Sequence, residues 1–286
     1  MAGPWALLRN VRYALPGYVG RVLPGPGAAA TASRCAGLER RGLAATIGYF
    51  DIPGARPEDI VAANVAIARQ LAGRGAGAYL SVKAPPLEFE VDRVRAIAEA
   101  GLALMFDAHA PEDADRTLEL VKGLLDPFPG TGFALPARWR RSARDAAAFR
   151  DSSARIRIVK GEWADPEWTE PDVEASYLAL VARLAGRTAP VGVATHDPEL
   201  AERALALLLR SGTPCELEQL RGLPSRRTSA VARRLGVPVR VYLPFGPGWW
   251  PYALDKALAR PYLLSWMIAD RLGGGASTPT RLIPGT

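Results

Sequence analysis

Polar side chains follow several short apolar runs of this sequence. They are, in chain order, Lys83, Asp107 with His109, Lys160 with Glu162, Thr195 with His196 and Asp197, Glu218, and Tyr242. Amines, carboxylates, imidazoles and phenols are the groups that transfer protons, hold charged ligands and bind metals. Both histidines of the chain belong to this set, which favours one functional site over scattered surface charge. A structural network of salt bridges is the alternative interpretation.

The apolar runs themselves have the length and composition of β-strands. Eight are predicted as strands: 45–49, 78–82, 102–106, 132–135, 155–159, 191–194, 214–217 and 239–243. Segments with apolar residues at three- and four-residue intervals lie between them and predict helices over 57–71, 92–100, 110–125, 142–149, 174–184, 197–209 and 225–235. Asp197 and Ser225 are expected to cap the last two of these helices.

This alternation predicts an α/β protein, a (βα)8 TIM-like barrel with a short N-terminal arm. We expect the arm over residues 1–30, the barrel over 31–272 and a flexible tail over 273–286. The glycines of 72–77 follow a predicted helix and precede a strand, so they do not indicate a dinucleotide-binding domain. Because the active site of such barrels lies at the carboxyl ends of the strands, the polar residues should converge there.

Composition narrows the class of protein. Lys and Arg number 36 against 29 Asp and Glu, a formal net charge of +7, but no basic run is interleaved with aromatics as nucleic-acid binding requires. No apolar run approaches the roughly 20 residues that span a membrane. The two cysteines form neither a disulfide framework nor a metal motif, and residues 1–20 do not resemble a secretory signal. These features predict a cytoplasmic protein whose basic charge would allow peripheral contact with an anionic membrane.

Five motifs, in order along the predicted strands, resemble those of the proline dehydrogenases, which are flavoenzymes built on a (βα)8 barrel. They are Ser81-Val82-Lys83, Phe106-Asp107, Arg157-Ile158-Val159-Lys160-Gly161, Ala194-Thr195-His196-Asp197, and Glu216-x-Glu218-x-Leu220-x-Gly222. The passage from Tyr242 to Pro261 is similar to the final strand and helix of that family. The resemblance runs from about Thr31 to the helix after Tyr252 and identifies the superfamily.

The resemblance implies a bacterial enzyme of amino-acid metabolism that passes a hydride from an amine or imino acid to noncovalently bound FAD, with a quinone as electron acceptor. It implies FAD contacts from Arg157, Val159, Lys160, Gly161, Glu162, Thr195, His196 and Glu218. The substrate pocket would be lined by Lys83, Asp107, Tyr242, Tyr252, Asp255 and Lys256. Positive charge near the flavin would stabilise its reduced, anionic form.

The chain departs from the family pattern around this same pocket. Asp255 and Lys256 stand where the family has two arginines that clamp the substrate carboxylate. Pro136 replaces a glutamine that faces the flavin, Glu162 a small residue and Glu218 a glutamine. An aspartate repels a carboxylate, and lysine lacks the planar fork of arginine. These departures predict that the substrate differs from proline.

Two other functions are compatible with the same barrel. In the first, the flavin is lost, and Glu162, Glu218 and His196, with Asp107 or His109, bind a divalent metal at the barrel mouth. No local metal motif supports that reading, and our main prediction includes no metal. In the second, the chain is a non-catalytic homologue that binds a ligand or a partner.

Overall fold

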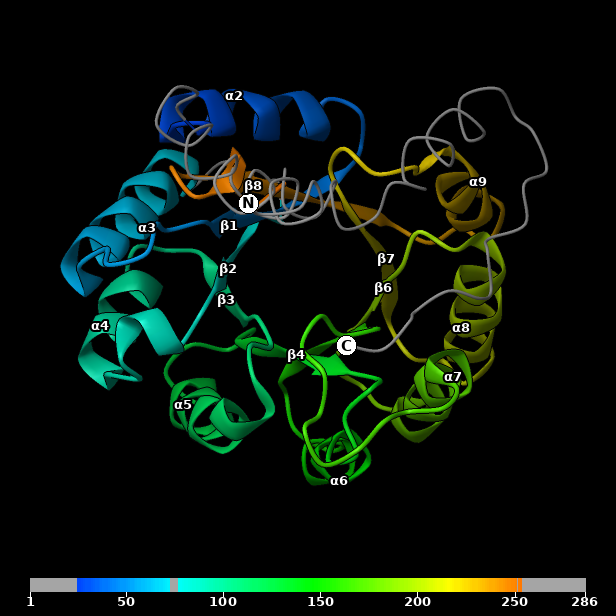
Figure 1. Ribbon diagram of the computed structural model, residues 1–286. Coiled ribbons are helices and arrows are strands. Elements are labelled where there is room, and N and C mark those ends of the chain that lie inside the picture. The colour runs from blue at the N-terminus through cyan, green and yellow to red at the C-terminus, as the bar shows by residue number, and fades with distance from the viewer. Residues whose placement is uncertain (1–24, 73–76, 251, 254–286) are drawn as a thin grey trace, which may run out of the picture.

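The eight predicted strands form a closed parallel barrel in the order β1 to β8. The computed structural model describes residues 25–72, 77–250 and 252–253. The strands are β1 (Ala44–Tyr49), β2 (Tyr79–Val82), β3 (Ala103–Phe106), β4 (Gly132–Pro136), β5 (Arg155–Val159), β6 (Val191–Ala194), β7 (Cys215–Leu220) and β8 (Val239–Phe245). The predicted (βα)8 architecture is confirmed, and Figure 1 shows the ring of strands inside a ring of helices.

The described residues form eight helices, of which the last seven match the predicted amphipathic segments to within a few residues, whereas the first, α2, corresponds to no segment predicted as a helix. They are α2 (Ala28–Glu39), α3 (Pro57–Leu71), α4 (Val91–Ala98), α5 (Ala114–Leu125), α6 (Ser142–Ala148), α7 (Val173–Leu184), α8 (Pro198–Arg210) and α9 (Arg226–Arg234). Short 3-10 turns, η1 (Pro85–Leu87) and η2 (Pro111–Asp113), precede α4 and α5. The turn η2 replaces the first residues of a predicted helix. Asp197 caps α8 through bonds from the amides of Glu199 and Leu200, whereas Ser225 makes no side-chain cap on α9.

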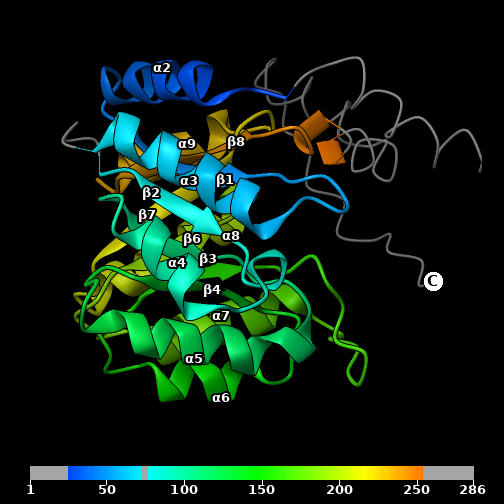
Figure 2. The same cartoon turned by 90° about the vertical axis from the view of Figure 1, so that its left-hand side faces the viewer.

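Helix α2 lies on the outside of the barrel and packs against α3 and β1 (Figure 2). Its buried residues include Ala32 and Cys35, which belong to the main hydrophobic core. The helix begins at Ala28, so it crosses the predicted boundary between the arm and the barrel. Residues 1–24 of the arm and the predicted tail lie outside the described residues.

Alternation along each strand divides the side chains between two environments. On β7, Leu217 joins the apolar layer between strands and helices, whereas its neighbours Glu216 and Glu218 form ion pairs with arginines of β5 and β8. On β6, a Cβ atom at Gly192 would lie 2.4 Å from Glu218 Oε1, so this glycine leaves room for an inward carboxylate. The barrel therefore has an apolar outer layer and a charged interior.

Two strand ends were predicted wrongly, one of them for this reason. The seventh strand was expected to stop at residue 217, but β7 continues to Leu220, so Glu218 lies within the strand and not after it. The eighth strand was expected to stop at residue 243 and continues to Phe245, and Tyr242 lies inside both the predicted and the observed strand. A charged or polar residue does not end a strand here because the barrel interior supplies its partners.

Candidate functional site

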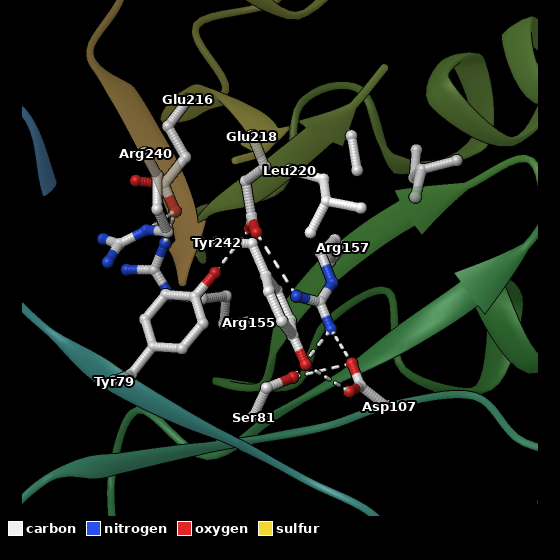
Figure 3. A network of polar contacts seen from close by, with 12 residues as sticks. Tyr79, Ser81, Asp107, Arg155, Arg157, Glu216, Glu218, Leu220, Arg240 and Tyr242 are labelled. Atoms are coloured by element: carbon white, nitrogen blue, oxygen red, sulfur yellow. Dashed lines mark hydrogen bonds and ion pairs between the residues drawn. The ribbon is translucent and has the colours of Figure 1, made fainter. Parts of the chain in front are cut away.

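Arg157 lies at the centre of the polar network inside the barrel (Figure 3). Its guanidinium forms ion pairs with Asp107, which follows β3, and with Glu218 of β7, where Nη1 is 3.4 Å from Oε2. Ser81 of β2 completes the contact, since its hydroxyl donates to Asp107 Oδ1 at 2.6 Å and accepts from Arg157 at 3.2 Å. The side chains of Arg157 and Glu218 are only 5% and 3% exposed, against 20% for Asp107. Asp107 is thus the member that reaches toward the barrel mouth.

Two tyrosines donate to these carboxylates. The hydroxyl of Tyr242 is 3.0 Å from Asp107 Oδ2, and that of Tyr79 is 2.5 Å from Glu218 Oε1. Burial raises the pKa of both phenols well above the usual value, so both remain protonated donors. Burial also raises the pKa of Glu218, an effect that the charge of Arg157 opposes.

Arg157 and the two carboxylates that it contacts form one layer of charge inside the barrel. A second layer lies below it and has one carboxylate between two arginines. Glu216 sits between two arginines, with Arg155 Nη1 at 2.6 Å and Arg240 Nε at 2.9 Å. Arg240 also donates to two backbone carbonyls and packs on the ring of Tyr79, 4.1 Å from its centroid. With all groups ionised, the two layers together hold three arginines and three carboxylates, so their charges balance.

Lys83 follows β2 at the mouth of the barrel. Its Nζ donates to the backbone carbonyl of Tyr49 at 2.7 Å and lies 4.1 Å from the centre of the Phe50 ring. Burial lowers the pKa of Lys83, while the nearby carboxylates of Asp107, Asp51 and Glu162 act in the opposite direction. The lysine therefore loses its proton more readily than an exposed lysine would.

Tyr252 and Glu162 meet across the mouth. The hydroxyl of Tyr252, beyond β8, donates to Glu162 Oε2, beyond β5, at 2.8 Å. The Tyr252 ring packs against Phe50 and Trp249, with centroids 5.0 and 5.9 Å away. Strands β5 and β8 are not neighbours in the barrel, so this bond spans its opening.

The segment that follows β5 packs closely on the segment that follows β4. The carbonyls of Val159 and Lys160 accept from the amides of residues 137 and 138, and the Lys160 side chain is exposed. Gly161 has a φ of 96°, and a Cβ there would lie 2.9 Å from carbon atoms of both Pro136 and Arg138. Glycine is required at this position by its conformation and by this contact.

Thr195 and His196 lie at the end of β6 and bond to neighbouring backbone. The Thr195 hydroxyl accepts from the amide of Asp197 at 3.1 Å. His196 Nδ1 is 2.6 Å from the carbonyl of Pro224, and the amide of Leu220 donates to Nε2 at 3.0 Å. These partners assign the proton to Nδ1 and fasten β6 to the loop before α9.

The alternative metal site receives no support from the described residues. Within residues 25–72, 77–250 and 252–253, no three His, Cys, Asp or Glu side chains are grouped as metal ligands. Glu218 is held by Arg157 and Tyr79, and His196 bonds to backbone groups. His109 stacks on Trp163 at 4.6 Å, with its Nδ1 3.6 Å from Asp113.

The residues present fit a planar anionic cofactor on the β5 side of the mouth. Arg157 Nε is buried and has no hydrogen-bond acceptor among the described residues, and exposed Lys160 adds positive charge at the strand end. On the β4 side Pro136 offers neither an amide side chain nor a backbone N–H. FAD would thus be held by Arg157, Lys160 and the end of β6, without a contact from β4.

The structure brings four of the predicted residues together in one network: Asp107, Arg157, Glu218 and Tyr242. Lys83, Glu162 and Tyr252 meet above it at the mouth, whereas predicted Asp255 and Lys256 lie outside the described residues. Their functional roles stay predictions. Tyr79, Arg155 and Arg240 were missed, although charged or aromatic residues at every second position of an apolar strand, as in Arg155-x-Arg157, indicate an inward polar face.

The fold and the site define a class: a closed parallel (βα)8 barrel with an ion-paired interior and a polar mouth at the carboxyl ends of its strands. No protein-family model matches the chain. Proline dehydrogenase 1 of Bacillus subtilis is 26% identical over 246 residues, 78% of this chain and 80% of that protein. Proline dehydrogenase of Deinococcus radiodurans is 28% identical over 185 residues, 62% of this chain and 59% of that protein. The chain is a divergent relative of the proline dehydrogenases.

Solved structures agree on the fold. Proline utilization A from Bdellovibrio bacteriovorus, inactivated by N-propargylglycine, superposes with a TM-score of 0.70 at 16% identity over 87% of this chain. The same protein from Corynebacterium freiburgense gives a TM-score of 0.65 at 16% identity over 98%. This chain covers 33% and 36% of those longer chains. Among the described residues, no helix is long and apolar enough to cross a membrane.

Proposed function

We propose that this chain is an FAD-dependent oxidoreductase of the proline dehydrogenase type that oxidises an amine or imino acid other than proline. The observation that carries the proposal is the clustering of Lys83, Asp107, Arg157 and Tyr242, which lie on or directly after β2, β3, β5 and β8. The relationship to proteins named proline dehydrogenases supports the reaction class. A quinone acceptor belongs to the proposal through the resemblance alone.

In this proposal FAD, when bound, supplies the hydride acceptor for the carbon next to the substrate nitrogen. Arg157 and Lys160 hold the cofactor through hydrogen bonds and charge, and the backbone at Gly161 allows close approach. Asp107, fixed by its bonds to Ser81 and Tyr242, faces the substrate at the mouth. Tyr252 and Glu162 cover the opening and reduce access of water.

Cofactor binding tests the proposal directly. Purified protein is expected to show the visible absorption of oxidised flavin or to acquire it when FAD is added, and proline is expected to bleach it slowly or not at all. Lys160→Met should raise the Kd for FAD about tenfold, because a cation near the flavin is lost. Lys122→Met, at an exposed position of α5, is the matched control. Colourless protein that takes up no FAD would contradict the proposal, and rapid reduction by proline would contradict the altered substrate.

Lys83 is expected to impose a pH dependence on flavin reduction. A protonated secondary amine must lose one N–H proton, which frees the nitrogen lone pair, before its neighbouring carbon can give up a hydride, and neutral Lys83 can accept that proton at Nζ. Since burial lowers the pKa of Lys83, the neutral form increases as pH rises, and the rate should rise with a midpoint below the 10.5 that is ordinary for lysine. Lys83→Met should slow reduction about 100-fold and remove this rise. Stopped-flow absorbance across pH measures both, and an unchanged profile in the variant would disprove the role.

A further inference from the structure

Asn64 interrupts the apolar face of helix α3. The buried residues of this helix are Ile60, Asn64, Ile67, Ala68 and Leu71, so an amide stands in a row of hydrocarbon side chains. Asn64 is 2% exposed, and its Nδ2 donates to the carbonyl of Ile60 at 2.9 Å, whereas its Oδ1 accepts no hydrogen bond among the described residues. A buried carbonyl without a donor is costly, so this oxygen requires a partner.

Lys83 has N–H groups that require acceptors. Its ammonium group carries three N–H bonds, and among the described residues only the carbonyl of Tyr49 accepts one of them, at 2.7 Å. The Phe50 ring lies 4.1 Å from Nζ and stabilises the charge through its face, but it does not replace an oxygen acceptor. A further acceptor is therefore needed beside this half-buried amine.

The acceptor of Asn64 and the donors of Lys83 belong to one small cavity. Asn64, Lys83, Asp51 and Ser81 are among the residues that line it, and it has room for about one water molecule. No hydrogen bond joins Asn64 to Lys83 directly among the described residues. A water molecule between them would donate to Asn64 Oδ1 and accept an N–H of Lys83, so it would satisfy both groups.

The charged groups around Lys83 come from three other parts of the barrel. Asp51 follows β1, Asp107 follows β3 and Glu162 follows β5, and each favours the charged lysine, whereas burial favours the neutral form. Asp107 is paired with Arg157, Glu162 is exposed, and Asp51 is half-buried at the cavity. A substitution at Asn64 leaves all of these charges in place, so its effect on Lys83 reports the water alone.

We propose that Asn64 holds a water molecule against Lys83 and thereby positions this lysine as the base of the reaction. The inference rests on the proposed oxidation and deepens it by naming a positioning residue of the same site. In neutral Lys83, the Tyr49 carbonyl and the water each accept one N–H, which leaves the lone pair of Nζ for the substrate. An N–H bond of the substrate ammonium then breaks, its proton bonds to Nζ, and the water stabilises the resulting lysine ammonium.

A crystal structure of the holoenzyme tests the water site. The wild-type protein should show one ordered water within hydrogen-bond distance of both Asn64 Oδ1 and Lys83 Nζ. Asn64→Leu should lack this water without lowering the melting temperature, because it removes a buried acceptor that has no protein donor. No water at this position in the wild-type protein, or a water that contacts Asn64 alone, would overturn the inference.

Flavin reduction across pH tests the effect on Lys83, with pyrrolidine and 4-hydroxyproline as the amine and the imino acid. Asn64→Leu should lower the rate at the high-pH plateau about tenfold, because the lone pair is no longer oriented. It should also move the midpoint to lower pH, since the ammonium loses a hydrogen bond. Asn64→Asp keeps the acceptor and adds a negative charge, so its plateau should stay within about threefold of wild type and its midpoint should move to higher pH.

The opposite shifts of the two midpoints separate positioning from a general loss of structure. Ile67→Val, which alters the same face of α3 one turn further along, is the matched control and should change neither plateau nor midpoint. Acetylation of Lys83 by acetic anhydride, followed by peptide mass spectrometry across pH, should show the same two shifts without turnover.

The outcomes distinguish the two proposals. If neither compound reduces the flavin, the oxidation proposal fails, while the crystal structure and the acetylation profile still decide whether the water is present and acts on Lys83. If oxidation proceeds but Asn64→Leu leaves the plateau and the midpoint unchanged, the inference about Asn64 is wrong and the oxidation stands.

Discussion

Replacing Arg157 with Met is expected to lower the free energy of unfolding by about 3–5 kcal/mol, the usual effect of breaking a buried ion pair by removing one partner. The variant leaves Asp107 and Glu218 facing each other without the cation that both contact. Urea denaturation followed by circular dichroism measures the loss. A change below about 1 kcal/mol would mean that the triad does not hold the barrel together.

Arg155→Met is the matched control. Arg155 is 22% exposed, and its partner Glu216 keeps Arg240 after the change, so the loss should stay below about 2 kcal/mol. The sign of the pH effect separates the two variants. Because burial raises the pKa of Glu218, its protonation removes an uncompensated charge as pH falls, and the deficit of Arg157→Met should shrink toward acid. Arg155→Met should show no such recovery.

Gly48→Ala is expected to destabilise the protein by about 3 kcal/mol, at the upper end of the range for overpacking. A Cβ atom at Gly48 would lie 1.8 Å from the hydroxyl of Tyr242 and 2.4 Å from Cζ. The Tyr242 side chain is half-buried and bonded to Asp107, so it cannot move without breaking that contact. Thermal and urea unfolding should both register the loss, together with weaker substrate binding.

The control variant is expected to change the stability in the opposite direction. Gly123 lies on the exposed face of α5, and a Cβ there meets nothing within 4 Å. Gly123→Ala should therefore stabilise the protein by about 0.5–1 kcal/mol through helix propensity. If both variants were equally destabilised, the contact with Tyr242 would not explain the result for Gly48.

Most of the fold could be predicted because strands and helices follow from patterns of apolar residues within short stretches of sequence. The apolar layer between strands and helices produces the strand runs and the helical periodicity, and α3 was predicted with its observed bounds, 57–71. The limits of β7 were not predictable in this way, because Glu218 has its partners on β2 and β5. The presence of a charged residue inside a strand can be explained only from the closed barrel, which shows the residues on other strands that it contacts.

The candidate site was predicted in part. Asp107, Arg157, Glu218 and Tyr242 were each chosen from sequence, but Arg157 and Glu218 were expected as flavin contacts and not as partners of each other. Because Arg157 and Glu218 lie 61 residues apart in the sequence, no local pattern indicates their ion pair. The bond between Glu162 and Tyr252 likewise depends on three-dimensional closure of the barrel.

The balance of three arginines and three carboxylates inside the barrel restricts how this protein can change during evolution. A substitution that alters one charge leaves a buried group uncompensated, so it can persist only when a second change restores neutrality. Glu216, which two arginines share, has a spare partner and tolerates the loss of one. Arg157 also has two partners, but it is the cation that both Asp107 and Glu218 contact, so its replacement is expected to require coupled changes at those two positions, and related sequences should show the three positions changing together.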